Sequence, residues 1–241
     1  MRRARALSAI EVLPPGDLLE VGCGAGALLD ELAHRGWRAV GIDSSERARD
    51  IAAAISRATG GNQRVLAAPD PGWSSRFDLI CALEVLEHIE DDRAALRQWA
   101  GWLRPGGVLL VSVPAHQRRW TAGDEWAGHF RRYERQDLLD LVEAAGLTVE
   151  MVECYGFPLG NLTEWLGAPA YRRKLRKRAP AHATKEAASA DSGVERDTAL
   201  RMFRWLDTIP GRVGLRAALA LQAATCKVDW GCGFLLRARR P

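Results

Sequence analysis

The sequence predicts an α/β fold of the Rossmann-like, doubly wound type. An apolar, strand-like run at 17–22 stops at a cluster of glycines between Gly22 and Gly26. A helical pattern begins directly afterwards, over 25–35, where apolar residues recur every three or four positions. Strand-like and helix-like segments then alternate along the chain, which is typical of βαβ units and a parallel sheet.

The first half of the chain continues this alternation. Residues 1–13 have the apolar spacing of a short leading helix, which Pro14 ends. The pattern then predicts a strand at 38–42, a helix at 46–58, a short strand at 64–67, a strand at 77–82, a helix at 93–103 and a strand at 108–113. The 77–82 strand is almost continuously apolar, as expected for a central parallel strand.

The second half is richer in helices. The pattern predicts a helix at 134–145, a strand at 147–155, a helix that contains Trp165 and Tyr171, helices at 197–207 and 212–226, and a strand at 233–239. Residues 179–196 are rich in Ala, Ser, Thr and charge, which favours a mobile connection.

The glycine-rich turn predicts a site for a nucleotide-type cofactor. Glycines let a backbone approach a ligand closely, and the helix start beyond them offers free N–H groups. Glu20 stands two residues before Gly22, where its carboxylate would repel a pyrophosphate but pair with an ammonium group. Asp43 comes 21 residues after Gly22, a spacing that places an acid beside ribose hydroxyls. The alternatives are a tight turn without a ligand, and Asp43 as the N-cap of the next helix.

Four motifs together resemble those of the class I S-adenosylmethionine-dependent methyltransferases. In chain order they are Leu18–Gly26, Val40–Ser45, Phe77–His88 and Leu103–Val111. The resemblance implies a seven-stranded sheet, mostly parallel, in which 233–239 is an antiparallel seventh strand. It divides the chain into an N-terminal helix at 1–16, a cofactor-binding core at 17–155, a helical insertion over the substrate at 156–228, and the final strand at 229–241.

The same resemblance implies S-adenosyl-L-methionine as the methyl donor and S-adenosyl-L-homocysteine as its product. The residues expected to bind it are Glu20, Gly22, Cys23, Gly24, Asp43, Ser44, Asp70, Leu83 and Glu84. Asp70 would hold the adenine amino group, but between two prolines it is equally a turn former, and Trp73 could cover the adenine instead.

Candidate catalytic residues follow the fourth and fifth strands. His88 could be a general base or a structural residue, since E-x-L-E-H occurs in family members with unlike substrates. The polar segment 114–133 contains His116 and His129, of which either is our preferred general base. Its candidate substrate-binding residues are Trp120, Asp124, Trp126, Arg132 and Tyr133. The alternative is a surface loop with a few packed tryptophans.

A metal is not expected to be required. Glu84, Glu87 and His88 nevertheless resemble a set that can hold a divalent ion in ubiquinone-pathway O-methyltransferases. One histidine and two carboxylates could bind Mg²⁺ or a transition ion.

Charge is unevenly distributed along the 241 residues, whose net charge is +4. Residues 160–241 contain 16 Lys and Arg against 7 Asp and Glu, whereas residues 1–159 contain 18 against 23. The basic segment 172–178 could contact a membrane surface, an acidic substrate or RNA. The sequence has no long apolar run, no signal-peptide core and five scattered cysteines, so we expect a cytoplasmic protein with reduced thiols.

We therefore expect a methyltransferase that acts on an O or N nucleophile of a small molecule. Nucleic acid is disfavoured, because the fourth motif lacks the D/N-P-P-Y/F signature of enzymes that methylate base amino groups. The alternatives are a lipid, quinone-precursor or RNA substrate recruited by 172–178, and a non-catalytic subunit that binds S-adenosylmethionine. A nicotinamide oxidoreductase is disfavoured by Glu20 and the later motifs. The oligomeric state is left open.

Overall fold

A computed structural model describes residues 2–61, 63–177 and 208–241. The mobile connection expected at 179–196 and the helix expected at 197–207 lie outside the described residues, as does Arg178 at the end of the basic segment.

The sheet has seven strands in the order β3-β2-β1-β4-β5-β7-β6. Its strands are β1 Asp17–Val21, β2 Arg38–Ile42, β3 Arg64–Leu66, β4 Phe77–Leu83, β5 Leu103–Pro114, β6 Thr148–Tyr155 and β7 Gly233–Arg239. Strands β1 to β5 pair in parallel, and β7 pairs antiparallel with both β5 and β6. The predicted fold class, including the antiparallel strand at 233–239, is confirmed.

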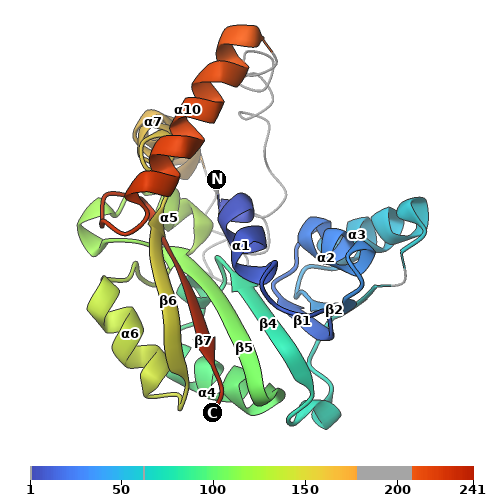
Figure 1. The fold of residues 1–241 in the computed structure, drawn as a ribbon. Coiled ribbons are helices and arrows are strands. Elements are labelled where there is room, and N and C mark those ends of the chain that lie inside the picture. The colour runs from blue at the N-terminus through green and yellow to red at the C-terminus, as the bar shows by residue number, and fades with distance from the viewer. Residues whose placement is uncertain (1, 62, 178–207) are drawn as a thin grey trace.

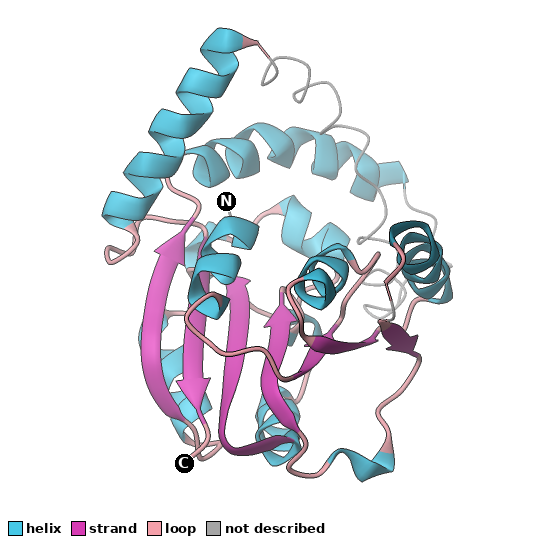
Figure 2. Cartoon of the chain, turned by 45° about the vertical axis from the view of Figure 1, so that its right-hand side comes forward, coloured by secondary structure: helices cyan, strands magenta, loops and turns pink. Residues whose placement is uncertain are grey.

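Helices cover both faces of the sheet and its upper end (Figure 1). They are α1 Arg2–Ile10, α2 Ala27–His34, α3 Glu46–Thr59, α4 Asp92–Trp102, α5 Ala122–Ala127, α6 Arg135–Glu143, α7 Leu159–Lys177 and α10 Ile209–Thr225. Helices α1, α2 and α3 lie on one face, and α4 and α6 lie on the other (Figures 1 and 2).

Each face of the sheet buries its own apolar core, because side chains alternate along a strand. Leu19 and Val21 of β1 point to the α4 and α6 side, where they join Trp99 of α4. Leu18 points to the other side and joins Leu29 of α2. Glu20, the neighbour of Val21, therefore faces the α2 side, among apolar residues.

The strand register brings the carboxyl ends of the central strands together. Val21 at the end of β1 lies opposite Ile42 of β2 and Ala82 of β4. The residues that follow these strands consequently meet at one edge of the sheet, which is where open α/β sheets bind ligands.

Two expectations for the middle of the chain require correction. Strand β5 begins at Leu103, not at 108, because Leu103 already pairs with Phe77 of β4. The register then shifts before Val108 pairs with Leu79, and Gly106 adopts a φ of 78° within this irregular stretch. The segment 114–133 is not a plain loop, since it contains the six-residue helix α5. Thr121 and Asp124 form a capping box at the start of α5, which stabilises so short a helix.

Helices α7 and α10 lie between β6 and β7 in the sequence and above the carboxyl ends of the strands in space (Figure 1). Helix α10 begins at Ile209, three residues earlier than expected, because Pro210 is tolerated in a first helical turn. No helix among the described residues is long and apolar enough to cross a membrane.

We predict that Leu236→Ala in β7 lowers the free energy of unfolding by about 2–5 kcal/mol. Leu236 is fully buried in the apolar core on the α4 and α6 side of the sheet, so its truncation leaves a cavity in that core. Leu221→Ala on α10, where Leu221 is 45% exposed, is the control and should change stability little. Urea denaturation of both variants measures the difference, and equal midpoints would contradict the importance of β7.

Candidate functional site

The turn after β1 requires glycine at two positions for different reasons. Gly22 has a φ of 64°, and a Cβ there would approach Cγ2 of Val85 to 2.5 Å. Gly24 has a φ of 53°, and a Cβ there would meet nothing within 4 Å. Gly22 is therefore needed for packing and backbone geometry, whereas Gly24 lies beside open space that a ligand can occupy.

Asp43 is tied to this turn. Its Oδ2 accepts a hydrogen bond from the Gly24 backbone N–H at 2.8 Å, and its Oδ1 accepts one from the Ser45 N–H at 2.9 Å. Ser45, not Asp43, caps helix α3 through the Ala48 N–H. Each carboxylate oxygen of Asp43 keeps a further lone pair that can accept a hydroxyl hydrogen.

Glu20 is a buried acid with an unsatisfied oxygen. Its side chain is 6% exposed, and Oε2 has no hydrogen-bond partner among the described residues. Burial raises the pKa of Glu20 to about 8, against the opposing effects of the Leu29 backbone N–H and the positive charge of Arg2. The nearby charge of Asp43 also raises it, so Glu20 and Asp43 act on one another across the ends of β1 and β2. A cationic ligand group would supply the partner that Glu20 lacks.

The remaining residues expected at the cofactor lie around this edge in different roles. Cys23 is buried beside Gly41, the Ser44 carbonyl accepts from Arg49, and Leu83 ends β4. Asp70 caps the turn at 71–73 by accepting from the Gly72 N–H at 2.8 Å, as expected of a turn former.

A hollow of about 500 Å³ opens beside the ends of β1 and β2, on the α4 side of the sheet. Its lining includes Val21, Ile42, Pro69, Asp91 and Trp99. Trp73 does not line it, because its ring is 2% exposed and packs edge-on against Phe77 and Trp102, so it is not placed to cover an adenine.

Glu84 follows β4 in a strained conformation, with a φ of 59°. Its Oε1 accepts hydrogen bonds from the Ser112 hydroxyl at 2.9 Å and the Tyr155 hydroxyl at 2.6 Å. Burial alone would raise the pKa of Glu84, but the charge of Arg2 and these two hydrogen bonds hold it below its usual value. Glu84 therefore remains an anion at the tip of β4.

His129 and Asp124 form a dyad at the end of α5. Nδ1 of His129 lies 3.0 Å from Oδ1 of Asp124, and Arg132 donates to both oxygens of the same carboxylate at 2.8 Å. Burial would raise the pKa of Asp124, yet the hydrogen bonds from His129 and Arg132 hold it well below its usual value. A permanently charged Asp124 fixes the ring of His129 and leaves its Nε2 for other partners.

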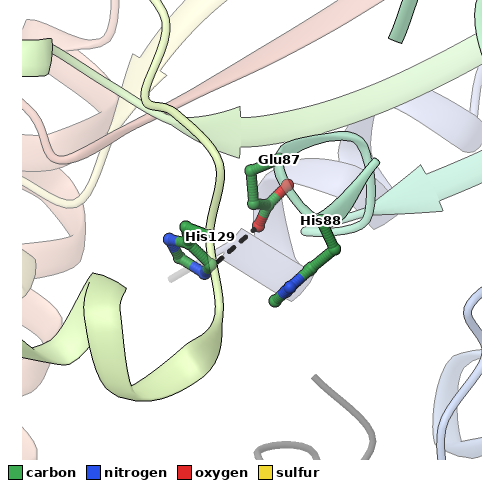
Figure 3. A group of neighbouring side chains, drawn as sticks. All are labelled: Glu87, His88 and His129. Atoms are coloured by element: carbon green, nitrogen blue, oxygen red, sulfur yellow. Dashed lines mark ion pairs between the residues drawn. The ribbon is translucent and has the colours of Figure 1, made fainter. Parts of the chain in front are cut away.

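Nε2 of His129 lies 3.9 Å from Oε1 of Glu87, and the rings of His129 and His88 are 4.7 Å apart (Figure 3). Glu87 is fully buried, and neither of its oxygens has a hydrogen-bond partner among the described residues. Burial and the charge of Glu84 raise the pKa of Glu87 well above its usual value, whereas burial and the charge of His129 lower the pKa of His88 to about 4. Burial thus favours the uncharged forms of both Glu87 and His88.

These three side chains could also hold a metal ion, since one donor atom from each lies within 4.8 Å of the others. The set differs from the one expected from the sequence. Oε1 of Glu84 accepts from Ser112 and Tyr155, and His129 takes the third place beside Glu87 and His88.

The other candidates from 114–133 have structural contacts. Nδ1 of His116 lies 3.0 Å from a Glu134 oxygen, and its ring packs edge-on against Phe234. These contacts differ from those of the His88–His129 pair. Arg132 and Tyr133 are buried, and the Tyr133 hydroxyl donates to Asp92 at 3.0 Å.

Two tryptophans of the segment are partly exposed. Trp126 stacks near Tyr171 of α7, with 5.2 Å between ring centroids, which joins α5 to the insertion. Trp120 follows the turn at 117–119.

Sequence reasoning missed three residues that contact Glu84, namely Ser112, Tyr155 and Arg2. Ser112 and Tyr155 are polar residues near the carboxyl ends of strands, a position that could have identified them. No sequence signal placed Arg2 at the site, because its approach depends on how α1 packs.

Solved structures share the fold. An S-adenosylmethionine-dependent methyltransferase from Mesorhizobium loti aligns with 100% of this chain and 98% of its own, at a TM-score of 0.60 and 18% identity. A cyclase aligns with 99% of this chain and 80% of its own, at a TM-score of 0.62 and 22% identity. At these identities the likeness shows the fold alone.

Curated relatives are similar over about half of the chain. The ubiquinone biosynthesis O-methyltransferase of Bradyrhizobium sp. (strain ORS 278) is 37% identical over 127 residues, which are 50% of this chain and 47% of that protein. The protein of the same name from Nitrobacter winogradskyi is 36% identical over 125 residues, 50% of this chain and 45% of its own. The chain thus spans about half the length of the curated relatives it matches.

The family model described as "Methyltransferase domain" matches residues 2–152, which is more than half of the chain. The match includes the glycine turn, Asp43, Glu84 and the His129 dyad. The chain therefore belongs to the class I S-adenosylmethionine-dependent methyltransferases.

Proposed function

We propose that this protein transfers the methyl group of S-adenosylmethionine to an O or N nucleophile of a small molecule. Family membership and the geometry around Glu20 and Asp43 support the donor. The observation that carries the nucleophile type is the Asp124–His129 dyad, in which Nε2 of His129 lies 3.9 Å from Oε1 of Glu87, shortly after β4. A group held in this way suits removal of a proton from a hydroxyl or an amine.

The bound donor would supply an already activated methyl group on a sulfonium. The protein's residues have the task of orientation. Asp43 would accept from the ribose hydroxyls, and Glu20 would pair with the donor's amino group. Cys23, Gly24, Ser44 and Leu83 would form the walls that position it between them. The hollow beside Val21 and Ile42 would receive the base, with Asp70 near its rim.

His129 would accept the acceptor's proton at Nε2 while Asp124 stabilises the resulting charge. His88 and His116 are weaker candidates for this role. The pKa of His88 is lowered to about 4, and His116 is engaged by Glu134. Trp120 and Trp126 remain our candidates for contacting the acceptor, since each is partly exposed on the same segment.

A divalent ion on Glu87, His88 and His129 is the alternative to a general base. The two unpartnered oxygens of buried Glu87 favour it, and Asp124 would orient His129 as a ligand. Such an ion would lower the pKa of a bound hydroxyl. Treatment with a chelator separates the two mechanisms. An enzyme that uses a general base keeps its turnover rate, whereas one that needs the ion loses it.

A substrate carried on a lipid is the alternative acceptor. Trp165 on α7 is 73% exposed and Leu166 is 58% exposed, close in sequence to the basic residues of 172–177. Exposed apolar and basic side chains on one helix suit the surface of an anionic membrane. This choice is tested by comparing the turnover of soluble phenols and amines with the turnover of vesicle-bound acceptors. If the protein binds the donor but turns over none of these acceptors, the result would favour a non-catalytic subunit.

We predict that Asp43→Ala weakens the binding of S-adenosylhomocysteine by at least about tenfold. The variant loses hydrogen bonds from the ribose to a charged acceptor and also releases the Gly24 N–H. Calorimetric titration measures the effect, and Asp50→Ala, an exposed acid on α3, is the matched control. Unchanged affinity in Asp43→Ala would refute the ribose assignment.

We predict that binding of S-adenosylhomocysteine at pH 7 releases nearly one proton. The pKa of Glu20 is raised to about 8 in the free protein, so its carboxyl is protonated at pH 7 and must ionise to pair with an ammonium. Affinity should therefore rise with pH up to about 8. Titrations in buffers of different ionisation enthalpy count the protons, and Glu20→Gln should show no release. A wild-type value of zero at pH 7 would rule out this pairing.

We predict that His129→Ala lowers turnover by about 10²–10⁴-fold without changing affinity for S-adenosylhomocysteine. The substitution removes the base but none of the groups assigned to the donor. Steady-state kinetics with an acceptor found in the substrate screen give the rate, and His34→Ala on the surface of α2 is the control. Equal rates in His129→Ala and wild type would exclude His129 as the base.

A further inference from the structure

Glu164 of α7 connects the helical insertion to the Asp124–His129 dyad. Its Oε1 lies 3.1 Å from Nη2 of Arg132, and its Oε2 accepts a hydrogen bond from Nη2 of Arg119 at 2.9 Å. Arg132 in turn donates to both oxygens of Asp124 at 2.8 Å. A continuous series of ion pairs therefore runs from α7, through Arg132, to the carboxylate that holds His129.

This connection is largely shielded from solvent. The side chains of Arg132 and Asp124 are 4% and 1% exposed, and that of Glu164 is 25% exposed. Burial would lower the pKa of Arg132, but the contacts with Asp124 and Glu164 raise it above its usual value. Without Glu164, part of a buried guanidinium charge would lose its partner, which costs more than the loss of an exposed ion pair.

Arg132 determines how Asp124 presents its oxygens to His129. Oδ1 of Asp124 contacts both Nε of Arg132 and Nδ1 of His129, so a shift of the guanidinium would shift the oxygen that orients the imidazole. Oδ2 is also held by Thr121, through its backbone N–H at 2.7 Å and its hydroxyl at 3.0 Å. The direction of His129 therefore depends on Arg132, and on the residue that holds Arg132 from its other side.

The aromatic contacts of α7 lie at a different place on the helix. Trp126 of α5 is 5.2 Å from Tyr171 between ring centroids, and Nζ of Lys174 lies 4.8 Å from the centroid of the Trp126 ring. Tyr171 is about two helical turns beyond Glu164, which is the one acidic residue in α7. The aromatic contacts pack α7 on α5, whereas the ion pairs of Glu164 link the position of α7 to the dyad.

We propose that Glu164 is a positioning residue for His129, and this rests on the proposed function, in which His129 is the general base. Glu164 acts through Arg132 and Asp124 rather than on the acceptor itself. The base consequently has its working orientation when α7 is packed above the carboxyl ends of the strands (Figure 1). Covering the acceptor and aligning the base then become one event, as in enzymes whose closure completes the catalytic set.

The test is a double-mutant cycle of Glu164→Gln and His129→Ala in the whole protein, with a soluble phenol or amine that the wild type methylates. Glu164→Gln keeps the size of the side chain but removes its charge, and should lower kcat by about 10- to 100-fold. Affinity for S-adenosylhomocysteine should not change. In the His129→Ala background the same substitution should alter the residual rate by less than about twofold, because no base is left to orient. Glu125→Gln, the same change at an exposed acid of α5, is the matched control and should leave the rate unaltered.

Different results would overturn different parts of this proposal. Equal losses in both backgrounds would mean that Glu164 supports the fold and not the base, and thermal unfolding of Glu164→Gln against Glu125→Gln checks that point. Weaker binding of S-adenosylhomocysteine in Glu164→Gln would place its effect at the donor. A wild-type rate in Glu164→Gln together with a slow His129→Ala would refute Glu164 alone, whereas a wild-type rate in His129→Ala would refute the base itself.

Discussion

The hydrogen bond from the Gly24 N–H to Asp43 joins the two structural elements on which the rest of the site depends. It links the turn after β1 to the end of β2, two strands that already pair in parallel up to Val21 and Ile42. The turn can make this bond because Gly24 adopts a φ of 53° next to open space. One contact therefore fixes the backbone that a donor must approach and the carboxylate that would hold its ribose.

Beyond that contact, the site is organised by an imbalance of charge. Oε2 of buried Glu20 and both carboxyl oxygens of buried Glu87 lack hydrogen-bond partners in the described part of the chain, and burial raises the pKa of both side chains. Glu84 stays ionised because Ser112, Tyr155 and Arg2 stabilise it. Such a constellation is unfavourable for a resting protein and favourable for one that receives a cation. A sulfonium donor with an ammonium group meets this requirement.

The sequence was sufficient for the fold and for the place of Glu20, the glycine turn and Asp43 in it. Alternating strand and helix patterns located the elements to within a few residues, and the glycine turn with Glu20 and Asp43 identified the edge where ligands bind. These features are local in sequence, so their spacing carries the information.

The acceptor side was less accessible to prediction. His129 was selected together with His116 and His88, and only tertiary packing separates them, by pairing His129 with Asp124 and His116 with Glu134. No sequence pattern indicated the contact of Arg2 with Glu84, because the two residues are more than eighty positions apart in the sequence. Helix α5 was missed since six residues give too little periodicity, although its T-x-x-D capping box was visible.

The position of β7 also bears on how the chain folds as it is synthesised. Strands β1 to β5 and the glycine turn can associate while the remainder is still on the ribosome, but β6 has no neighbour in the sheet until Gly233–Arg239 emerges and inserts beside it. The exposed edge of β5 must therefore remain unpaired until Gly233–Arg239 has been synthesised, a period in which it is open to aggregation. Insertion of the final strand closes that edge and anchors both ends of the α7–α10 segment in a single step.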